Sequence, residues 1–343
     1  LTNTFPSPRT ENWSSLAPLD PVLAATVLEN LLNAHVSVYK HLKGLPGGSE
    51  ANIGLVKNIF QFEPIRRWHI LDWVYSNVLN DVFTNSTLEL LKHGKSTFYL
   101  PGMVSKEMKN PMAVGTLDFI GLNYYSRMHV KGQVSLKEPF SFEKRENDIQ
   151  TDMDYALYPE GFYKALHTIS TLNKPIYVTE NGVADRGDSI RTLFIDRYLY
   201  ALKMALKDGI DIRGYFYWTL MDNFEWAEGY DMKFGLYEVD FKTQKRSLRK
   251  SSKLFSEIVK RRGADERGYI VDIGDNAPDF TMEFTTREKV SLSELRGQVV
   301  VLQFTASWCS VCRKEMPHLE KDVWQAFKDK GVILIGIDRD EPL

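Results

Sequence analysis

Two sets of side chains in this 343-residue sequence have the types and spacing to carry out chemistry. The first set combines carboxylates with large aromatic residues: Glu180 ends an apolar run within Thr-Glu-Asn-Gly, and Trp218 is followed by the pair Glu225-Trp226. Sugar hydroxyls need polar partners and pyranose faces need flat apolar platforms, so this mixture indicates a carbohydrate site. Each residue alone has a plainer interpretation. Glu180 could be a turn residue at a strand end, and Glu225-Trp226 an ordinary loop with a buried tryptophan.

The second set is the cysteine pair, Cys309 and Cys312, which are the only two cysteines of the chain. Two cysteines exclude a disulfide-rich scaffold. The β-branched run 299–306 precedes the pair and a helical pattern, 314–330, follows it. A cysteine at the start of a helix gains thiolate character from the helix dipole, and the second cysteine can then resolve a mixed disulfide. The alternatives are a zinc half-site, for which His318 is the nearby histidine, and inert structural thiols.

The elements that must position these residues alternate between helix-like and strand-like patterns. Near-continuous apolar strands separated by helices predict an α/β fold with a parallel sheet covered on both faces. Only four such strands are present before residue 263, whereas a closed (β/α)8 barrel needs eight. A βαβ unit is predicted around the cysteines, with strands at 299–306 and 332–338 and the helix 314–330 between them. The strands expected before residue 263 are 52–60, 117–125, 174–180 and 212–220, and the helices are 22–43, 65–80, 161–171, 189–207 and 250–262.

Composition and charge limit the other classes of protein. The net charge of −2 argues against a nucleic-acid-binding surface, and no apolar run is long enough to span a bilayer. Residues 264–343 are net acidic and residues 1–263 slightly basic, which supports a domain boundary between them. The chain starts with leucine and shows no signal peptide, so we expect a cut or processed N-terminus, and a cytoplasmic location is favoured without being settled.

Four motifs of the first segment occur in a characteristic order. They are GLNYYS at 121–126, YVTENG at 177–182, YFYWTLMDNFEWAEGY at 215–230 and FGLYEVD at 234–240. Together they resemble the C-terminal half of glycoside hydrolase family 1, the retaining β-glucosidases, over roughly residues 15–263. This resemblance implies a partial (β/α)8 barrel of about four C-terminal βα units, acting on the O-glycosyl bond of a β-glucoside-type sugar without a cofactor or a metal.

The resemblance also implies roles for individual residues. Glu180 matches the nucleophile that forms the glycosyl-enzyme, and Tyr125 matches the tyrosine whose hydroxyl bonds this nucleophile. Five further residues match positions that line or bind the sugar: Asn123, Trp218, Glu225, Trp226 and Phe234.

One part of the family pattern is missing. The acid/base glutamate of the family lies in an Asn-Glu-Pro element, and no Asn-Glu-Pro occurs in this sequence. The nearest similar sequence contains Glu63, at a place where the family often has Glu-Pro without a catalytic role. General acid/base catalysis contributes about 10²–10⁴-fold. We therefore expect residues 1–263 alone to be impaired or inactive as a hydrolase, and to fold poorly because strand edges are exposed.

The second segment has a resemblance of its own. GDNAPDF at 274–280, VSLSELRG at 290–297, the Trp-Cys pair and Glu-Met-Pro at 315–317 are similar to redoxin-like thiol–disulfide oxidoreductases of the thioredoxin superfamily. The resemblance implies a partial thioredoxin-like α/β fold over 264–343, with Cys309 attacking, Cys312 resolving and a dithiol or disulfide protein as partner. The chain ends before the family's cis-proline loop. An inactive fused fragment is therefore a third hypothesis beside the hydrolase and the oxidoreductase.

Overall fold

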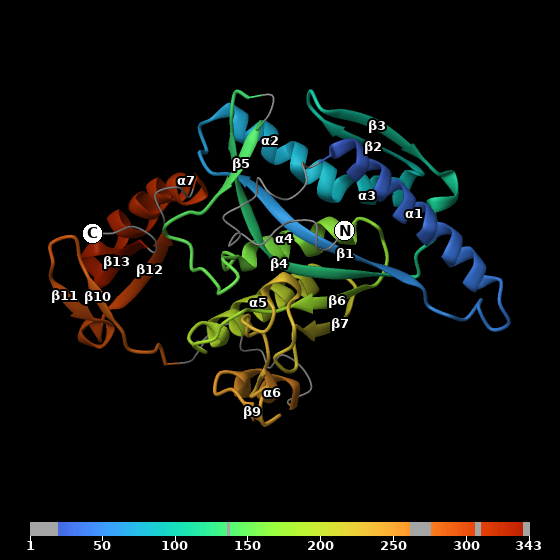
Figure 1. The fold of residues 1–343 in the computed structure, drawn as a ribbon. Coiled ribbons are helices and arrows are strands. Elements are labelled where there is room, and N and C mark those ends of the chain that lie inside the picture. The colour runs from blue at the N-terminus through green and yellow to red at the C-terminus, as the bar shows by residue number, and fades with distance from the viewer. Residues whose placement is uncertain (1–19, 136–137, 261–275, 306–309, 339–343) are drawn as a thin grey trace. The chain divides into compact units, whose positions relative to one another are not determined.

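The computed structural model describes residues 20–135, 138–260, 276–305 and 310–338 (Figure 1). The chain forms two compact units, Leu1–Gly268 and Tyr269–Leu343.

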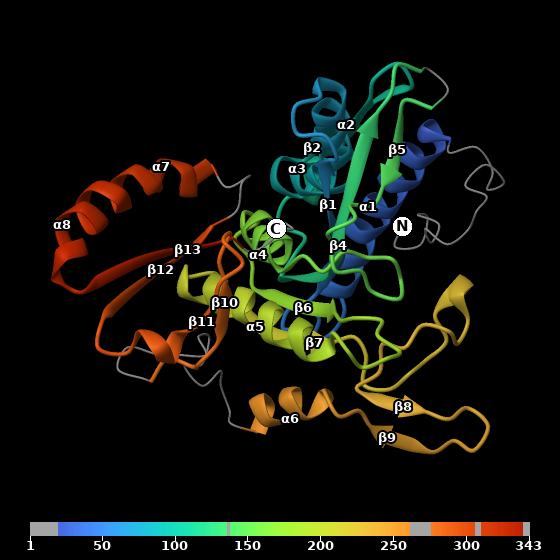
Figure 2. The same ribbon diagram turned by 90° about the vertical axis from the view of Figure 1, so that its left-hand side faces the viewer.

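A parallel sheet forms the centre of the first unit. Its strands are β1 (Gly54–Pro64), β4 (Phe119–Gly132), β6 (Ile176–Asn181) and β7 (Ile212–Tyr217), in the order β1-β4-β6-β7 (Figure 2). All three pairings are parallel. The four predicted strands and the α/β class are confirmed, and the parallel register brings the C-terminal ends of the strands to one edge of the sheet.

One face of this sheet packs against helices. Ile120, Leu122 and Val178 are fully buried in a cluster with Phe162 of α4 (Pro159–Ser170) and Phe194 of α5 (Arg191–Lys207). Burying an aliphatic or aromatic side chain of this size contributes about 1.5–3 kcal/mol. The near-continuous apolar strands are thus explained on this side of the sheet.

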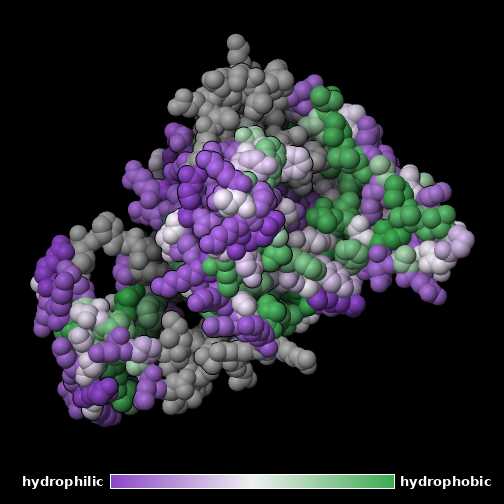
Figure 3. Space-filling view, turned by 60° about the horizontal axis from the view of Figure 1, so that its bottom comes forward, coloured by the Kyte–Doolittle hydropathy of each residue, from purple (hydrophilic) through white to green (hydrophobic). Residues whose placement is uncertain are grey.

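The opposite face differs from the prediction of a sheet covered on both faces. Val56 of β1 and Phe216 of β7 remain 48% and 58% exposed among the described residues. Four strands do not close on themselves, so no other strand covers these side chains within the described part of the chain. On the side of the molecule seen in Figure 3, apolar residues reach the surface as several separate green patches.

The helix boundaries follow local capping. α1 (Pro21–Lys43) begins after Asp20, whose Oδ1 accepts hydrogen bonds from the amides of Val22 and Leu23. α2 (Ile70–Asn80) starts later than the predicted residue 65 because the Ile65 amide donates to a carbonyl of β4 instead. A π-helical turn at Asp81–Asn85 then leads into α3 (Ser86–His93). The predicted helix 250–262 is seen as α6 (Ser252–Lys260), and its last two residues lie outside the described ranges.

The sequence patterns did not predict the antiparallel strands, and they predicted an end of β4 that is too early. β4 runs on from the predicted end at residue 125 to Gly132, and its extension pairs with β5 (Phe140–Glu143). Two hairpins complete the first unit: β2 (Lys95–Leu100) with β3 (Val104–Lys109), and β8 (Tyr237–Val239) with β9 (Arg246–Leu248). These strands are short or rich in charged residues, so they lack the apolar pattern that marks a buried strand.

The second unit contains the predicted βαβ arrangement. β12 (Val299–Thr305) pairs in parallel with β13 (Val332–Asp338). Helical segments connect them: α7 (Ser310–His318), a π-helical segment at Leu319–Trp324, α8 (Gln325–Phe327) and a 3₁₀ turn at Lys328–Lys330. β10 (Thr281–Glu283) and β11 (Lys289–Ser291) form a hairpin, and a 3₁₀ turn follows at Leu292–Leu295.

Candidate functional site

Three of the predicted sugar-site residues lie where β6 and β7 end: Tyr125 in the middle of β4, Glu180 near the end of β6 and Trp218 just after β7. Tyr125 of β4 and Glu180 of β6 are joined directly, because the Tyr125 hydroxyl donates a 2.7 Å hydrogen bond to Glu180 Oε2. Trp218 follows the last residue of β7, and its amide donates to the Asn181 carbonyl. Functional groups of parallel α/β folds collect at this end of the strands.

Two residues beside Glu180 hold its strand end in place. Asn181 is fully buried. Its side-chain Nδ2 donates a 2.6 Å hydrogen bond to the Tyr124 carbonyl, and its Oδ1 accepts a 2.9 Å hydrogen bond from the Tyr215 hydroxyl. Asn181 therefore links three neighbouring strands. At Gly182, a Cβ atom would lie only 1.6 Å from the Trp218 carbonyl oxygen, so no other residue fits without moving the backbone. Sequence reasoning noted both residues only as neighbours of Glu180.

The surroundings of Tyr125 keep its hydroxyl protonated, so that it can donate a hydrogen bond to Glu180. Burial, together with the adjacent Glu180 carboxylate, raises the pKa of Tyr125 well above its usual value. The hydroxyl therefore keeps its proton at neutral pH. A charge-assisted hydrogen bond of this kind orients a carboxylate and is stronger than a bond between neutral groups.

Glu225 lies in the segment after β7 and has a carboxylate oxygen that lacks a partner. Burial raises the pKa of Glu225, the Glu180 and Glu228 carboxylates raise it further, and a hydrogen bond from Trp218 lowers it. Its buried Oε2 has no hydrogen-bond partner among the described residues. Buried acceptors are nearly always satisfied in native proteins, so a ligand hydroxyl is a fitting partner for this atom.

The aromatic residues of the site differ in exposure. Phe234 is only 3% exposed and packs edge-on against Tyr125, with ring centroids 6.1 Å apart. Trp218 is partly buried in the same cluster, and a cis peptide bond joins it to Thr219. Trp226 begins the 3₁₀ turn Trp226–Glu228 and is 68% exposed. The structure therefore groups Trp218 and Phe234 with Tyr125, whereas the Trp226 indole faces solvent.

Asn123 and Glu63 are occupied by other contacts. Asn123 is the register partner of Glu180, but its Oδ1 accepts a 2.6 Å hydrogen bond from Thr179. Glu63 accepts from the Tyr158 hydroxyl over 2.6 Å and from Arg127 over 3.0 Å. Burial works to raise the pKa of Glu63, but the Tyr158 hydrogen bond and the Arg127 charge lower it overall. A general acid needs a raised pKa, so Glu63 is poorly suited to that role.

A metal site, a membrane span and a redox pair each have requirements that the described residues can be checked against. No group of three or more His, Cys, Asp or Glu side chains there could hold a metal ion. None of the helices described is long and apolar enough to cross a membrane. In the second unit Cys312 lies in α7, while Cys309 falls outside the described residues, so the geometry of the cysteine pair is not described.

Comparison with known proteins identifies the first unit. Residues 24–264 match the family described as glycosyl hydrolase family 1. The chain belongs to glycosyl hydrolase family 1. The family predicted from the four motifs is thereby confirmed. Residues 273–343 separately match the AhpC/TSA family, which confirms a redoxin segment.

The relatives of this family 1 chain include several glycosidases. It is 31% identical to a beta-galactosidase of Pyrococcus woesei over 281 residues, covering 73% of this chain and 53% of that protein. It is 32% identical to beta-glucosidase A of Thermotoga maritima, covering 72% and 58%. The solved beta-glycosidase from Pyrococcus horikoshii superposes with a TM-score of 0.62 at 35% identity, covering 73% and 59%. The family 1 chain thus spans little more than half the length of these relatives.

Proposed function

We propose that the first unit is about four C-terminal βα units of a (β/α)8 barrel and that it binds β-glucoside-type sugars as a retaining glycosidase does. The hydrogen bond from Tyr125 to Glu180 carries this proposal, because it orients a carboxylate at the strand ends where family 1 glycosidases act. The Oε2 of Glu225, which has no hydrogen-bond partner among the residues described, supports a sugar hydroxyl as ligand. Trp218, which bonds Glu225, and Phe234, which packs against Tyr125, supply apolar walls.

The proposed chemistry starts at Glu180. Its carboxylate attacks the anomeric carbon, a bond from that carbon to Glu180 forms, and the glycosidic C–O bond breaks with its electron pair moving to the leaving oxygen. Tyr125 holds the attacking carboxylate in line. A retaining enzyme needs a second carboxyl group about 5–5.5 Å from the nucleophile to protonate the leaving oxygen.

We propose that this protonation is the impaired step. The sequence has no Asn-Glu-Pro element, and the carboxylate of Glu63 is held ionised by Tyr158 and Arg127. A leaving group that is stable as an anion can depart without being protonated by a general acid. The alkoxide of a leaving sugar is unstable and needs that proton. The site should therefore favour activated aryl glycosides over natural disaccharides.

The test compares two substrates. With 2,4-dinitrophenyl β-glucoside we expect release of dinitrophenolate that is lost in Glu180→Gln and kept in Glu238→Gln, a matched change at an exposed carboxylate of β8. With cellobiose we expect a rate at least about 10²-fold lower. No release from the aryl glucoside would contradict the proposed nucleophile. Rapid cellobiose hydrolysis that depends on Glu180 would contradict the impairment.

A second activity is proposed for the redoxin segment, on the basis of its AhpC/TSA match and the β12–α7–β13 order. We propose that residues 264–343 form part of a thioredoxin-like fold and that Cys309 and Cys312 exchange with a protein disulfide. Two electrons and two protons would pass from the dithiol to the partner, leaving an intramolecular disulfide. Insulin reduction in the presence of dithiothreitol should then be lost in Cys309→Ser. If this assay and the glycoside assay both fail, the inactive fused fragment is the better description.

A further inference from the structure

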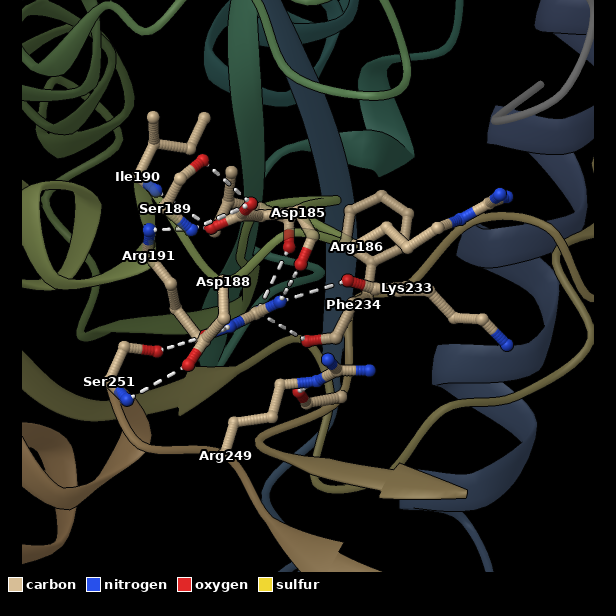
Figure 4. Close-up of polar contacts among 12 residues, drawn as sticks. Asp185, Arg186, Asp188, Ser189, Ile190, Arg191, Lys233, Phe234, Arg249 and Ser251 are labelled. Carbon is tan, nitrogen blue, oxygen red and sulfur yellow. Dashed lines mark hydrogen bonds and ion pairs between the residues drawn. The ribbon is translucent and has the colours of Figure 1, made fainter. Parts of the chain in front are cut away.

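A single buried arginine connects two loops of the candidate sugar site. Arg191 is the first residue of α5, and its side chain is 0% exposed. Figure 4 shows its guanidinium between the loop containing Asp185 and the loop containing Lys233 and Phe234. Such complete burial of a charged side chain requires that its donors be satisfied inside the protein.

The acceptors of Arg191 come from the segments that follow β6 and β7. Its Nη1 donates to the Val183 and Phe234 carbonyls over 3.1 and 3.0 Å, and Nη2 donates to the Asp185 and Lys233 carbonyls over 2.9 and 3.0 Å. The loop after β6 begins next to Glu180, and the loop after β7 carries Trp218, Glu225 and Trp226. One planar group therefore joins the loop next to the proposed nucleophile to the loop with the proposed sugar contacts.

The remaining donors of Arg191 bind strand and helix ends. Nη1 also donates to the Tyr217 hydroxyl over 2.7 Å, at the end of β7, and Nε donates to Asp188 Oδ1 over 3.1 Å. Asp188 in turn accepts hydrogen bonds from the amide and the hydroxyl of Ser251, just before α6. No other side chain offers five donors in a fixed plane, so lysine cannot reproduce this set of contacts.

The position of Arg191 itself is set by Asp185. Asp185 Oδ2 accepts hydrogen bonds from the Ile190 and Arg191 amides, both over 2.8 Å, which fixes the first turn of α5. The Asp185 amide donates to the Lys233 carbonyl over 3.0 Å. The two loops are thus joined by a backbone bond as well as by the guanidinium.

A short path leads from Arg191 to the proposed nucleophile. Arg191 holds the Phe234 carbonyl, the Phe234 ring packs edge-on against Tyr125, and the Tyr125 hydroxyl donates to Glu180. A shift of the loop after β7 would therefore move the aromatic support of Tyr125. Misplacement of reacting groups by about 1 Å can cost about 10²-fold in rate.

We propose that Arg191 is a positioning residue of the sugar site, which fixes the spacing between the Glu180 strand end and the loop that carries Glu225. It does not touch the sugar. This inference rests on the proposed sugar-binding function for its ligand measurements, but the coupling of the two loops can be measured without any ligand.

The ligand-free test measures hydrogen exchange of backbone amides in the full chain. Arg191→Ala and Arg191→Lys should both speed exchange in residues 182–190 and 218–236 together. Arg249→Ala is the matched control in the second loop, because the Arg249 side chain is also buried but, among the described residues, bonds only Asp222 and the Gly235 carbonyl. It should speed exchange in residues 218–239 alone. Equal loosening of the whole unit in Arg191→Lys, or no change in the 182–190 loop, would overturn the inference.

The ligand test uses glucoimidazole, which is bound in a solved structure of the Thermotoga maritima beta-glucosidase. By calorimetry, Arg191→Ala should bind it at least about 10-fold more weakly, and millimolar guanidinium should restore part of the affinity. Arg66→Ala, which breaks an ion pair with the buried Asp72 at a distant site, should destabilise the chain and leave the affinity unchanged. Unchanged affinity in Arg191→Ala would overturn the inference. If the unaltered chain binds no glucoimidazole, the proposed function fails and hydrogen exchange alone decides on Arg191.

Discussion

At the scale of single residues, the site depends on a donor that cannot ionise near neutral pH. Tyr125 is buried beside a carboxylate, which raises its pKa well above the usual value and keeps the hydroxyl protonated. Its hydrogen bond to Glu180 therefore persists over the whole range in which a glycosidase would work. Hydrogen bonds to charged groups contribute about 1.5–3 kcal/mol.

Removing this hydroxyl should slow the first chemical step. In Tyr125→Phe we expect labelling of Glu180 by 2,4-dinitrophenyl 2-deoxy-2-fluoro-β-glucoside to fall by about 10-fold or more, since about 1.4 kcal/mol corresponds to a factor of ten. Mass spectrometry of the intact chain measures the rate. Tyr124→Phe is the matched control, because that hydroxyl donates to the Tyr158 carbonyl instead. An equal loss of labelling in both variants would show that the Tyr125 bond has no special role.

A second residue-scale prediction concerns acid stability. Asp72 is fully buried. Burial alone would raise its pKa, but hydrogen bonds from Arg66 and from the Gly132 amide lower it to about 2. Because the folded pKa lies below the usual 3.8, this group stabilises the fold above about pH 4, and the contribution is lost as the pH falls toward 2. We expect Asp72 to contribute about 1–2 kcal/mol to the free energy of unfolding above about pH 4. The lower figure allows for solvent screening of the partly exposed Arg66.

The measurement is urea unfolding, followed by tryptophan fluorescence, at pH 6 and pH 3. The free energy of unfolding should fall less between these two pH values in Asp72→Asn than in the unaltered chain. An identical pH dependence in both proteins would mean that Asp72 does not carry this contribution. Asp196→Asn, at an exposed residue of α5, provides the comparison for a surface carboxylate.

At the scale of elements, strand ends and their connecting loops set the geometry of the site. β6 and β7 approach so closely after their last residues that Gly182 lies against the Trp218 carbonyl. Asn181, the last residue of β6, links this strand to Tyr124 of β4 and Tyr215 of β7 through its side-chain amide. The strand end that carries Glu180 is therefore held by contacts with both neighbouring strands.

Enlarging Gly182 should disturb this contact. In Gly182→Ala the new methyl group would overlap the Trp218 carbonyl, so the loop after β7 must move. We expect glucoimidazole affinity to fall by about 10-fold or more, with a loss of unfolding free energy of about 1–3 kcal/mol from overpacking. Gly187→Ala is the control, because a Cβ there would make only ordinary van der Waals contacts, 3.8 Å from Ser189 Oγ and 3.9 Å from Asp185 Oδ1. Gly209→Ala would not serve, because Gly209 has a positive φ. Unchanged affinity in Gly182→Ala would contradict the close approach.

At the scale of the whole molecule, the first unit buries one face of its sheet and leaves the other partly open. A cavity of about 320 Å³ opens on that face, lined in part by Tyr177, Arg213 and Phe216. Exposed apolar surface of this kind binds apolar molecules and promotes association. The proposed sugar site lies at the C-terminal ends of the strands, away from Arg213 near the start of β7.

This open face should bind an anionic apolar dye. We expect anilinonaphthalene sulfonate to fluoresce with the unaltered chain, because Phe216 offers an apolar contact and Arg213 a positive charge. Phe216→Lys should reduce the fluorescence, whereas Trp68→Lys, at an exposed residue outside the cavity, should reduce it much less. Equal effects of the two changes would place the dye elsewhere.

The sequence by itself determined the family, the four parallel strands and the helices between them. Apolar periodicity is a local property, so 212–220 and 332–338 could be recognised as strands without tertiary information. The long motifs likewise singled out Glu180 and Tyr125, which a hydrogen bond joins in the structure. The hairpins and β5 were missed because charged, short strands derive their stability from pairing with a neighbour, which local patterns do not show.

Only the tertiary structure decided how the site is supported. Arg191 and Asn181 carry no sequence signature of function, and their importance comes from carbonyls and hydroxyls that lie far away along the chain. Likewise Glu63 could be weighed as an acid from its Glu-Pro sequence, but the Tyr158 and Arg127 contacts show a carboxylate held ionised. Burial and hydrogen bonding set pKa and position, and both arise only when separate elements pack together.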